Sequence, residues 1–451
     1  MILRNSLADT IAAIATPSGF GGIGIIRLSG PKAIEVADHC WVSLKKLKEL
    51  PDRQLTRGKV LDDQAMAVVM RAPDSYTGEE VVEFHCHGSP VLLQSILTGL
   101  FKNGARPAEP GEFTKRAFLN GKLDLVQAEA VADLIASETE KGAELAARQL
   151  SGFLSGVIGK IKNDLMVMRA QIEAMIDFPE DEDVQGLYSE EMSGRVEDLK
   201  NRVTRLLATF EEGRRFREGV QVVICGRPNV GKSSLLNALL EEDRAIVHPT
   251  PGTTRDLVDG AINLNGLPVR FIDTAGIREG LGSIESEGIR RSWEKVRSAD
   301  LILFLVDRSL PFQEEDFSLY EKIADKKPLI IFNKKDLPAA STASPLTPLL
   351  EISAQEKEGI GELKALLYER LIGSSKSSSA ELLLTNPRHK NCLGETLLAL
   401  ERVSEGVAQK ISFEFLAADL LGAANHLAEI TGEITHDEIL GEIFARFCLG
   451  K

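Results

Sequence analysis

The run Gly226-Arg227-Pro228-Asn229-Val230-Gly231-Lys232-Ser233 restricts the possible folds of this chain more than any other feature. It matches the P-loop pattern, in which a glycine, four further residues, a second glycine, a lysine and a hydroxyl residue follow one another. An apolar run at 220–225 precedes the motif and a helix-like run at 234–240 follows it, as a strand–loop–helix unit requires. Backbone N–H groups of such a loop surround phosphates, while Lys232 reaches the β- and γ-phosphates and the Ser233 hydroxyl can ligate Mg²⁺.

Further short motifs follow apolar runs along the chain. They are Asp273-Thr274-Ala275-Gly276, Asn333-Lys334-Lys335-Asp336 and Ile352-Ser353-Ala354. In the first motif, the aspartate can face the ligand shell of Mg²⁺ and the glycine N–H can meet the γ-phosphate. The last motif is suited to a loop that contacts the base. The Asp336 carboxylate can accept hydrogen bonds from the N1–H and N2–H₂ groups of guanine, which adenine does not offer. In this order, each at a strand end, the motifs predict a GTP-binding α/β domain.

Composition limits the remaining possibilities. The chain has 451 residues, room for about three domains. No apolar run approaches the ~20 residues that span a bilayer, and the N-terminus lacks a signal-peptide pattern, so we expect a cytoplasmic protein without membrane contact. The five scattered cysteines fit a reducing compartment. With a net charge of −14, a basic face for RNA is not expected, so a partner would supply much of the phosphate contact to an RNA.

The pattern along the chain predicts a multidomain protein. Residues 1–120 combine short apolar runs with turns, as an α+β domain does. Residues 121–218 and 373–451 show helical periodicity, and 219–372 has the size of one Ras-like α/β P-loop GTPase domain. The GTPase domain is therefore predicted to be inserted into one helical domain. Two separate helical domains are the alternative.

The residue after Asp273-Thr274-Ala275-Gly276 is unusual for a Ras-type enzyme. Ras-type enzymes place there a glutamine that orients the attacking water, whereas this chain has Ile277. Three other features could take over this role. Asn229 could coordinate a monovalent cation beside the phosphates, the long loop 245–256 could add carbonyl ligands, and Glu285 could hold a water.

The GTPase motifs at 226–237, 251–256, 273–279 and 333–336 are shared by several translation-linked GTPases, including Era and Der. Segments outside the GTPase domain are more specific. The runs 9–30, 75–88 and 106–135, with the C-terminal Phe447-Cys448-Leu449-Gly450-Lys451, resemble the MnmE (TrmE) family of bacterial tRNA-modification GTPases. The resemblance covers the whole chain.

The resemblance implies a GTPase that is activated when two GTPase domains meet in the presence of K⁺. It assigns K⁺ ligation to Asn229, His248, Thr250 and Thr253, Mg²⁺ ligation to Ser233 and Thr254, and catalysis to Glu285. His248 departs from the threonine often found there, which a carbonyl ligand tolerates. The expected GTP-binding residues are Asn229, Val230, Gly231, Lys232, Ser233, Ser234, His248, Pro249, Thr250, Pro251, Gly252, Thr253, Thr254, Asp273, Thr274, Ala275, Gly276, Asn333, Lys334, Asp336, Ser353 and Ala354.

The resemblance also implies a second site, in an N-terminal domain that forms a homodimer. A formyl- or methylene-tetrahydrofolate would bind there to Arg27, Glu83, Lys122 and Lys451. Cys448 is either a catalytic thiol, as nucleophile or one-carbon carrier, or a residue that assists packing; the residues leave both open.

With the FAD-dependent protein MnmG (GidA), in a heterotetramer or larger complex, the chain would add an aminomethyl or carboxymethylaminomethyl group to C5 of the wobble uridine of certain tRNAs. The alternatives are a ribosome-assembly GTPase of the Era/Der type and a folate-binding regulatory scaffold whose nucleotide site only switches. The first predicts a basic RNA-binding segment, which is not evident in the sequence. The second predicts no steady-state GTP turnover.

Overall fold

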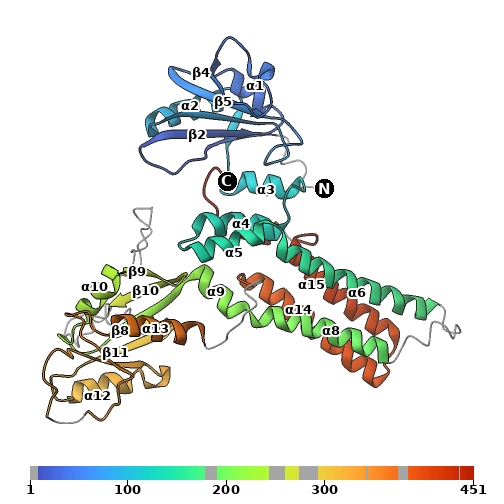
Figure 1. The fold of residues 1–451 in the computed structure, drawn as a ribbon. Coiled ribbons are helices and arrows are strands. Elements are labelled where there is room, and N and C mark those ends of the chain that lie inside the picture. The colour runs from blue at the N-terminus through green and yellow to red at the C-terminus, as the bar shows by residue number, and fades with distance from the viewer. Residues whose placement is uncertain are drawn as a thin grey trace, which may run out of the picture. The chain divides into compact units, whose positions relative to one another are not determined.

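The computed structural model of the chain describes residues 9–177, 190–242, 260–273, 293–341, 344–373, 384–435 and 437–451. These residues form two compact units (Figure 1). The first comprises residues 1–135, 146–200 and 395–451, and the second comprises 136–145 and 201–394.

The N-terminal part of the first unit is built on a seven-stranded sheet in the order β3-β4-β5-β6-β2-β1-β7. Neighbouring strands are antiparallel except for the parallel pair β1–β7. The strands are β1 (Thr10–Ile14), β2 (Gly21–Ser29), β3 (Trp41–Val42), β4 (Thr56–Val60), β5 (Asp63–Met70), β6 (Val81–Gly88) and β7 (Ala105–Pro107).

Alternation along β6 shows how this sheet separates its two faces. Val82, Phe84 and Cys86 are buried in a core shared with the helices α1 (Ala33–Asp38) and α2 (Pro90–Lys102). The residues between them, Glu83 and His85, belong to the opposite face and are only partly buried. A short turn of 3₁₀ helix, η2 (Leu47–Glu49), adds the buried Leu47 to the same core. One strand thus serves both a hydrophobic core and a polar face.

Long helices complete the first unit. They are α3 (Glu112–Leu119), α4 (Leu125–Ala136), α5 (Glu140–Leu150), α6 (Phe153–Asp177), α8 (Glu190–Ala208), α14 (Pro387–Gln409), α15 (Phe413–Thr431) and α16 (Asp437–Phe444). Of these, α5 and α14 begin in the second unit, and α8 ends in it. α6 buries Leu154, Ile158, Ile161 and Leu165 at helical spacing, and α15 lies alongside it (Figure 1). Since α6 precedes the GTPase motifs and α15 follows them, the predicted insertion is confirmed. The domain boundaries remain predictions.

The second unit is organised around a six-stranded sheet in the order β13-β12-β11-β8-β10-β9. All pairs are parallel except β9–β10. The elements are α9 (Phe210–Glu218), β8 (Val220–Cys225), α10 (Lys232–Glu242), β9 (Gly260–Leu264), β10 (Leu267–Asp273), β11 (Leu301–Asp307), α12 (Glu314–Glu321), η3 (Ala324–Lys326), β12 (Leu329–Asn333), β13 (Leu350–Glu351) and α13 (Ile360–Ile372).

Both faces of this sheet are covered, as in doubly wound α/β folds. On β8, Val222 and Ile224 belong to one hydrophobic core with residues of α10 and α13, whereas Val223 and Cys225 belong to a second core near α12. The chain leaves β8 toward β9 and β10 on one side, while β11 lies on the other side. The loop after β8 therefore starts at the topological switch point, where such sheets bind ligands. Of the described helices, none is long and apolar enough to cross a membrane.

Candidate functional site

The conformation of the loop between β8 and α10 depends on the two glycines that the P-loop pattern specifies. Gly226, Asn229 and Gly231 have positive φ angles of 151°, 61° and 100°. A Cβ atom on Gly226 would lie 2.3 Å from the Leu305 carbonyl oxygen, and one on Gly231 would lie 2.2 Å from Nδ2 of Asn333. Because α10 begins at Lys232, the positive end of its helix dipole faces the loop, which favours an anion there.

Lys232 is already held by this loop. Its Nζ donates to the carbonyl oxygens of Gly226, at 3.0 Å, and Arg227, at 2.9 Å, and the residue is buried. Ser233 follows in the first turn of α10 and is exposed. The loop therefore presents an ammonium group, a hydroxyl group and backbone N–H groups together, which is the donor set that a nucleotide phosphate with Mg²⁺ requires.

Asn333 connects the P-loop to the base-contacting loops. Its Nδ2 donates to the Val230 carbonyl at 2.8 Å, and its Oδ1 accepts from the backbone N–H of Ala354 at 2.9 Å. The side chain is buried between loops that follow three different strands. The asparagine of the Asn333–Asp336 motif is thus a structural clamp that sets the distance between the phosphate and base sites.

Asp336 stands at the exposed end of the same motif. Its Oδ1 accepts from the Ser353 hydroxyl at 2.5 Å, which fixes the carboxylate. Lys334 has a φ of 64°, and its Nζ lies 2.7 Å from Oδ2 of Asp307. Burial raises the pKa of the Asp307 carboxyl, but hydrogen bonds from Lys334 and Ser309 outweigh burial and leave that pKa below its ordinary value. The structure therefore brings the predicted residues Asn333, Asp336, Ser353 and Ala354 together.

The remaining predicted nucleotide residues lie outside the described residues. They are His248, Pro249, Thr250, Pro251, Gly252, Thr253, Thr254, Thr274, Ala275, Gly276 and Glu285, together with the side chain of Asp273. The second Mg²⁺ ligand, most K⁺ ligands and the catalytic glutamate therefore stay predictions.

A second group of predicted residues meets in the first unit, around Arg27. Arg27 lies opposite Glu83 in the β2–β6 ladder, and its Nε donates to Oε1 of Glu83 at 2.7 Å. Its Nη1 donates to the carbonyl of Gly450, 423 residues away in sequence, at 3.3 Å. The rings of Tyr76 and Phe113 each have their centroid 5.7 Å from the guanidinium carbon. We call this arrangement the tail site.

The C-terminal residues enter the tail site because Gly450 fits closely against β1. Its φ is 89°, and a Cβ atom there would lie 2.3 Å from the Ile14 carbonyl oxygen. Phe447 is buried against Phe444 and Leu125, whereas Cys448 is exposed. Burial and the positive charge of Arg27 lower the pKa of the Lys451 ammonium group, while Glu83 and Cys448 oppose this shift.

Lys122 is not joined to this group. Its Nζ donates to the Pro73 carbonyl at 2.9 Å on the exposed surface. In the described part of the chain, no hydrogen bond or ion pair connects it with Arg27, Glu83 or Lys451. Three of the four predicted folate contacts therefore meet, and the fourth does not.

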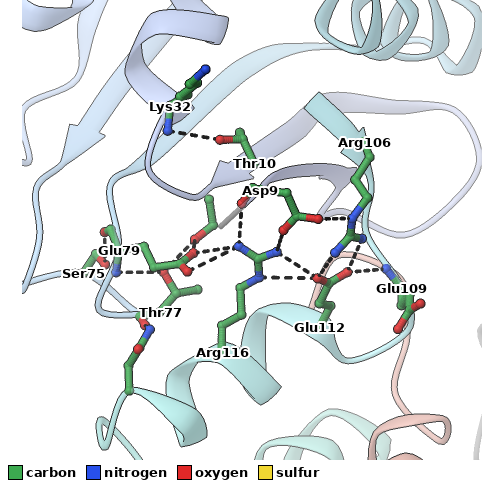
Figure 2. Close-up of polar contacts among 12 residues, drawn as sticks. Asp9, Thr10, Lys32, Ser75, Thr77, Glu79, Arg106, Glu109, Glu112 and Arg116 are labelled. Carbon is green, nitrogen blue, oxygen red and sulfur yellow. Dashed lines mark hydrogen bonds and ion pairs between the residues drawn. The ribbon is translucent and has the colours of Figure 1, made fainter. Parts of the chain in front are cut away.

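A charged network that the sequence did not predict lies beside the tail site (Figure 2). Arg116 is only 1% exposed and lies within ion-pair distance of the carboxylates of Asp9, Glu79 and Glu112. Two of these partners lie far from Arg116 in sequence, and only the i,i+4 spacing of Glu112 and Arg116 is a local signal. The network fixes the loop 75–79, where the Tyr76 hydroxyl is hydrogen-bonded to Thr114 at 2.9 Å.

Comparisons with known proteins identify the family of this chain. Residues 10–122 match the family model for the N-terminus of the GTP-binding protein TrmE, and 125–448 match the model for the MnmE helical domain. The tRNA modification GTPase MnmE of Carboxydothermus hydrogenoformans is 43% identical over 99% of this chain and 100% of its own length. The protein of the same name from Geotalea uraniireducens is 43% identical over 98% of this chain and 99% of its own.

Among solved structures, Era of Aquifex aeolicus bound to GDP and AlF₄⁻ is 26% identical. It covers 40% of this chain and 66% of its own, with a TM-score of 0.28, which is too low to support a structural argument. The full-length identity and the two family models decide the assignment: the chain belongs to the MnmE family of tRNA modification GTPases.

Proposed function

We propose that this chain hydrolyses GTP to GDP and phosphate as part of tRNA modification. The observation that carries the GTPase part is the Asn333 clamp, which joins the P-loop carbonyl of Val230 to the loop of Ala354 while Ser353 orients the Asp336 carboxylate. A phosphate site and a guanine-selective carboxylate are thereby held in one unit. The shared name of the relatives supports the tRNA part.

The ion requirements follow from the same loop. Ser233 is exposed in the first turn of α10, where a hydroxyl can ligate Mg²⁺. Asn229 is exposed in the left-handed conformation that asparagine tolerates, so its side-chain oxygen is free of the core. We therefore include Mg²⁺ and K⁺ in the proposal, with Thr254 as the second Mg²⁺ ligand and with His248, Thr250 and Thr253 completing the K⁺ shell. Glu285 would position the attacking water.

The second part of the proposed function is the binding of a tetrahydrofolate at the tail site. Arg27 and Lys451 offer positive charge for the carboxylates of a tetrahydrofolate, and Glu83 offers an acceptor for the N–H groups of a pterin. The aromatic side chains of Tyr76 and Phe113 flank this charge. These residue types fit a folate, which would bring a formyl or methylene unit. Lys122 remains a predicted contact of the folate, and Cys448 remains either a reactive thiol or a packing residue.

The finer reaction concerns the wobble uridine. In this proposal a homodimer works with the flavoprotein MnmG, which handles electrons, and the one-carbon unit is added at C5 of the uridine. GTP hydrolysis would drive opening and closing of the GTPase domains and would form no bond to the base. The net charge of −14 favours a partner that provides most of the contacts to the tRNA phosphates.

Steady-state turnover tests the GTPase part. We expect the purified chain to release phosphate from GTP rapidly in K⁺ and slowly in Na⁺ at equal ionic strength, and to leave ATP unchanged. Equal rates in both salts would remove K⁺ from the proposal. Binding of GTP without turnover in either salt would favour a regulatory scaffold over an enzyme.

The tRNA part is tested in cells that lack the chain. Mass spectrometry of their tRNA should show wobble uridines without the C5 group, and the full-length gene should restore it. Unchanged uridines, with a defect in ribosome assembly instead, would favour the Era/Der alternative.

A further inference from the structure

The second residue of the P-loop, Arg227, turns its side chain into the protein. The side chain is 9% exposed, and its Nε lies 2.7 Å from Oδ1 of Asp316, whose side chain is fully buried. In the described part of the chain, Asp316 is the sole carboxylate within ion-pair distance of this guanidinium group. Arg227 is thus attached to a residue of α12, a helix that contributes no motif of the nucleotide site.

Asp316 is itself fixed in place. Its Oδ2 accepts from the backbone N–H of Gln313 at 3.0 Å, as part of a capping box at the start of α12. Leu319 and Tyr320, later on the same helix, pack against the core that contains Val223 and Phe304 of the sheet. The Asp316 carboxylate is therefore a rigid anchor, because both its own hydrogen bond and its helix hold it.

The backbone of Arg227 also holds the P-loop lysine, Lys232. Its carbonyl oxygen accepts from Nζ of Lys232 at 2.9 Å. One residue therefore joins the buried Asp316 carboxylate, through its side chain, to the Lys232 ammonium group, through its main chain. A movement of Arg227 would rotate the carbonyl that orients Lys232.

The hydrogen-bond geometry of the Arg227–Asp316 ion pair is unfavourable for a pair whose sole role is to stabilise the fold. The Nε–H does not point at the Asp316 oxygen, although the distance is short, and the buried Nη2 has no hydrogen-bond partner among the described residues. Removing two charges from water costs several kcal/mol per ion, and a pair of apolar side chains often stabilises a core at least as well. A buried pair with imperfect hydrogen bonds suggests a different role.

We propose that Asp316 and Arg227 are a positioning pair that holds the P-loop, and through it Lys232, in the conformation that binds nucleotide phosphates. Neither side chain contacts the nucleotide. The proposal rests on the proposed GTP-binding function, and it adds α12 to the elements that determine nucleotide affinity. It predicts that a change at Asp316 lowers the affinity for GDP and GTP alike, since Lys232 reaches the β-phosphate of both.

The variant Asp316→Asn separates positioning from helix capping, because asparagine keeps an oxygen that can accept from Gln313. We expect the affinity for GDP, measured by titration with a fluorescent analogue, to fall about 10- to 100-fold, which corresponds to the loss of one charged contact. Glu315→Gln is the matched control, since it makes the same charge change at an exposed position of the first turn of α12 and should leave affinity unchanged.

A double-mutant cycle tests whether Asp316 acts on nucleotide affinity through Arg227. Arg227→Gln alone, and Arg227→Gln with Asp316→Asn, should lose about as much affinity as Asp316→Asn alone, because all three break the same connection. The double variant also removes both buried charges, so it decides the question if the single variants do not fold. Wild-type affinity in the double variant, or additive losses, would overturn the positioning role. A wild-type chain that binds no guanine nucleotide would instead overturn the proposed function.

Discussion

The nucleotide site and the tail site of this chain are assembled in different ways. The phosphate-binding part of the nucleotide site is a contiguous loop, whose geometry depends on glycines at 226 and 231 and on the start of α10. The tail site joins Arg27 to Gly450 across 423 residues, and each side chain comes from a different element. The phosphate-binding loop is therefore encoded locally, whereas the tail site exists only when the C-terminus is docked on β1.

Because they are assembled differently, the nucleotide site and the tail site should respond independently to substitutions and deletions. A substitution in a contiguous loop acts on the ligand directly, so its effect should appear in nucleotide affinity or turnover. The tail site depends on a docked segment, so removing that segment should abolish the site without affecting the other. If a change at either site always alters the other site as well, this contrast between the nucleotide site and the tail site is wrong.

Removing the C-terminal segment should have the largest effect. Deletion of residues 447–451 removes the buried Phe447, the Gly450 carbonyl and Lys451, so folate binding and uridine modification should both be lost. GTP turnover should stay within about twofold, a change in activation free energy well under 1 kcal/mol. Calorimetry with a tetrahydrofolate and mass spectrometry of tRNA would measure the first two quantities.

The exposed Leu449 provides the control for this deletion. Leu449→Ala changes a side chain that is 62% exposed and keeps all the contacts named above, so it should behave like the wild type. Normal folate affinity and normal modification in the truncated chain would show that the tail is dispensable.

Glu285→Ala should have the next largest effect, on turnover. A residue that positions water or a proton contributes about 10²–10⁴-fold to the rate, so single-turnover hydrolysis should slow by that order. GTP affinity should change little, because no ground-state contact is expected. Glu287→Ala, two residues further along the chain, is the control. A collapse of affinity with turnover per bound GTP preserved would assign Glu285 a structural role.

Asp336→Asn should weaken GTP binding by a smaller amount. The variant loses one of two charged acceptors for guanine, which is worth about 2–4 kcal/mol, or roughly 30-fold or more in affinity. Selectivity against other bases should fall as well. A direct titration would test this, with the exposed Asp325→Asn as the control. An unchanged dissociation constant for GTP would reject the base-binding role of Asp336.

The charged network beside the tail site should give the smallest effect, on stability. Burial raises the pKa of the Glu112 carboxyl, but hydrogen bonds from Arg106 and Arg116 outweigh it and leave that pKa below its ordinary value of 4.5. A lowered folded-state pKa stabilises the protein above pH 4.5, and this contribution is lost as the pH falls through the folded-state value. The unfolding midpoint should therefore drop in acid.

Glu112→Gln should remove part of that acid sensitivity and cost about 1.5–3 kcal/mol near neutral pH. Nucleotide affinity should stay at the wild-type value, since the network lies in the first unit. Glu109→Gln, at an exposed position just before α3, is the control. If Glu112→Gln shows the wild-type stability and pH profile, the network does not contribute as described.

Much of the nucleotide site could be predicted from the residues because its chemistry is local. Gly226, Gly231 and Lys232 were recognisable since a phosphate-binding loop tolerates few other residues at those positions. The base loop of Asp336 and Ser353 followed from motifs at strand ends, and the family resemblance behind both sites is confirmed by full-length relatives. Arg227 and Asp316 were not predicted to meet, because their contact depends on where α12 packs.

The sequence by itself determined the P-loop, the order of the nucleotide motifs and the family. These depend on backbone conformations and side-chain chemistry that neighbouring residues specify. Only the tertiary structure decided that Gly450 lies on β1, that Arg116 collects carboxylates of Asp9 and Glu79, and that Lys122 stands apart from Arg27. The physical reason is that such contacts join residues far apart in the chain. Packing and the need to compensate buried charge select the partners in these contacts. The spacing of residues along the chain indicates neither of them.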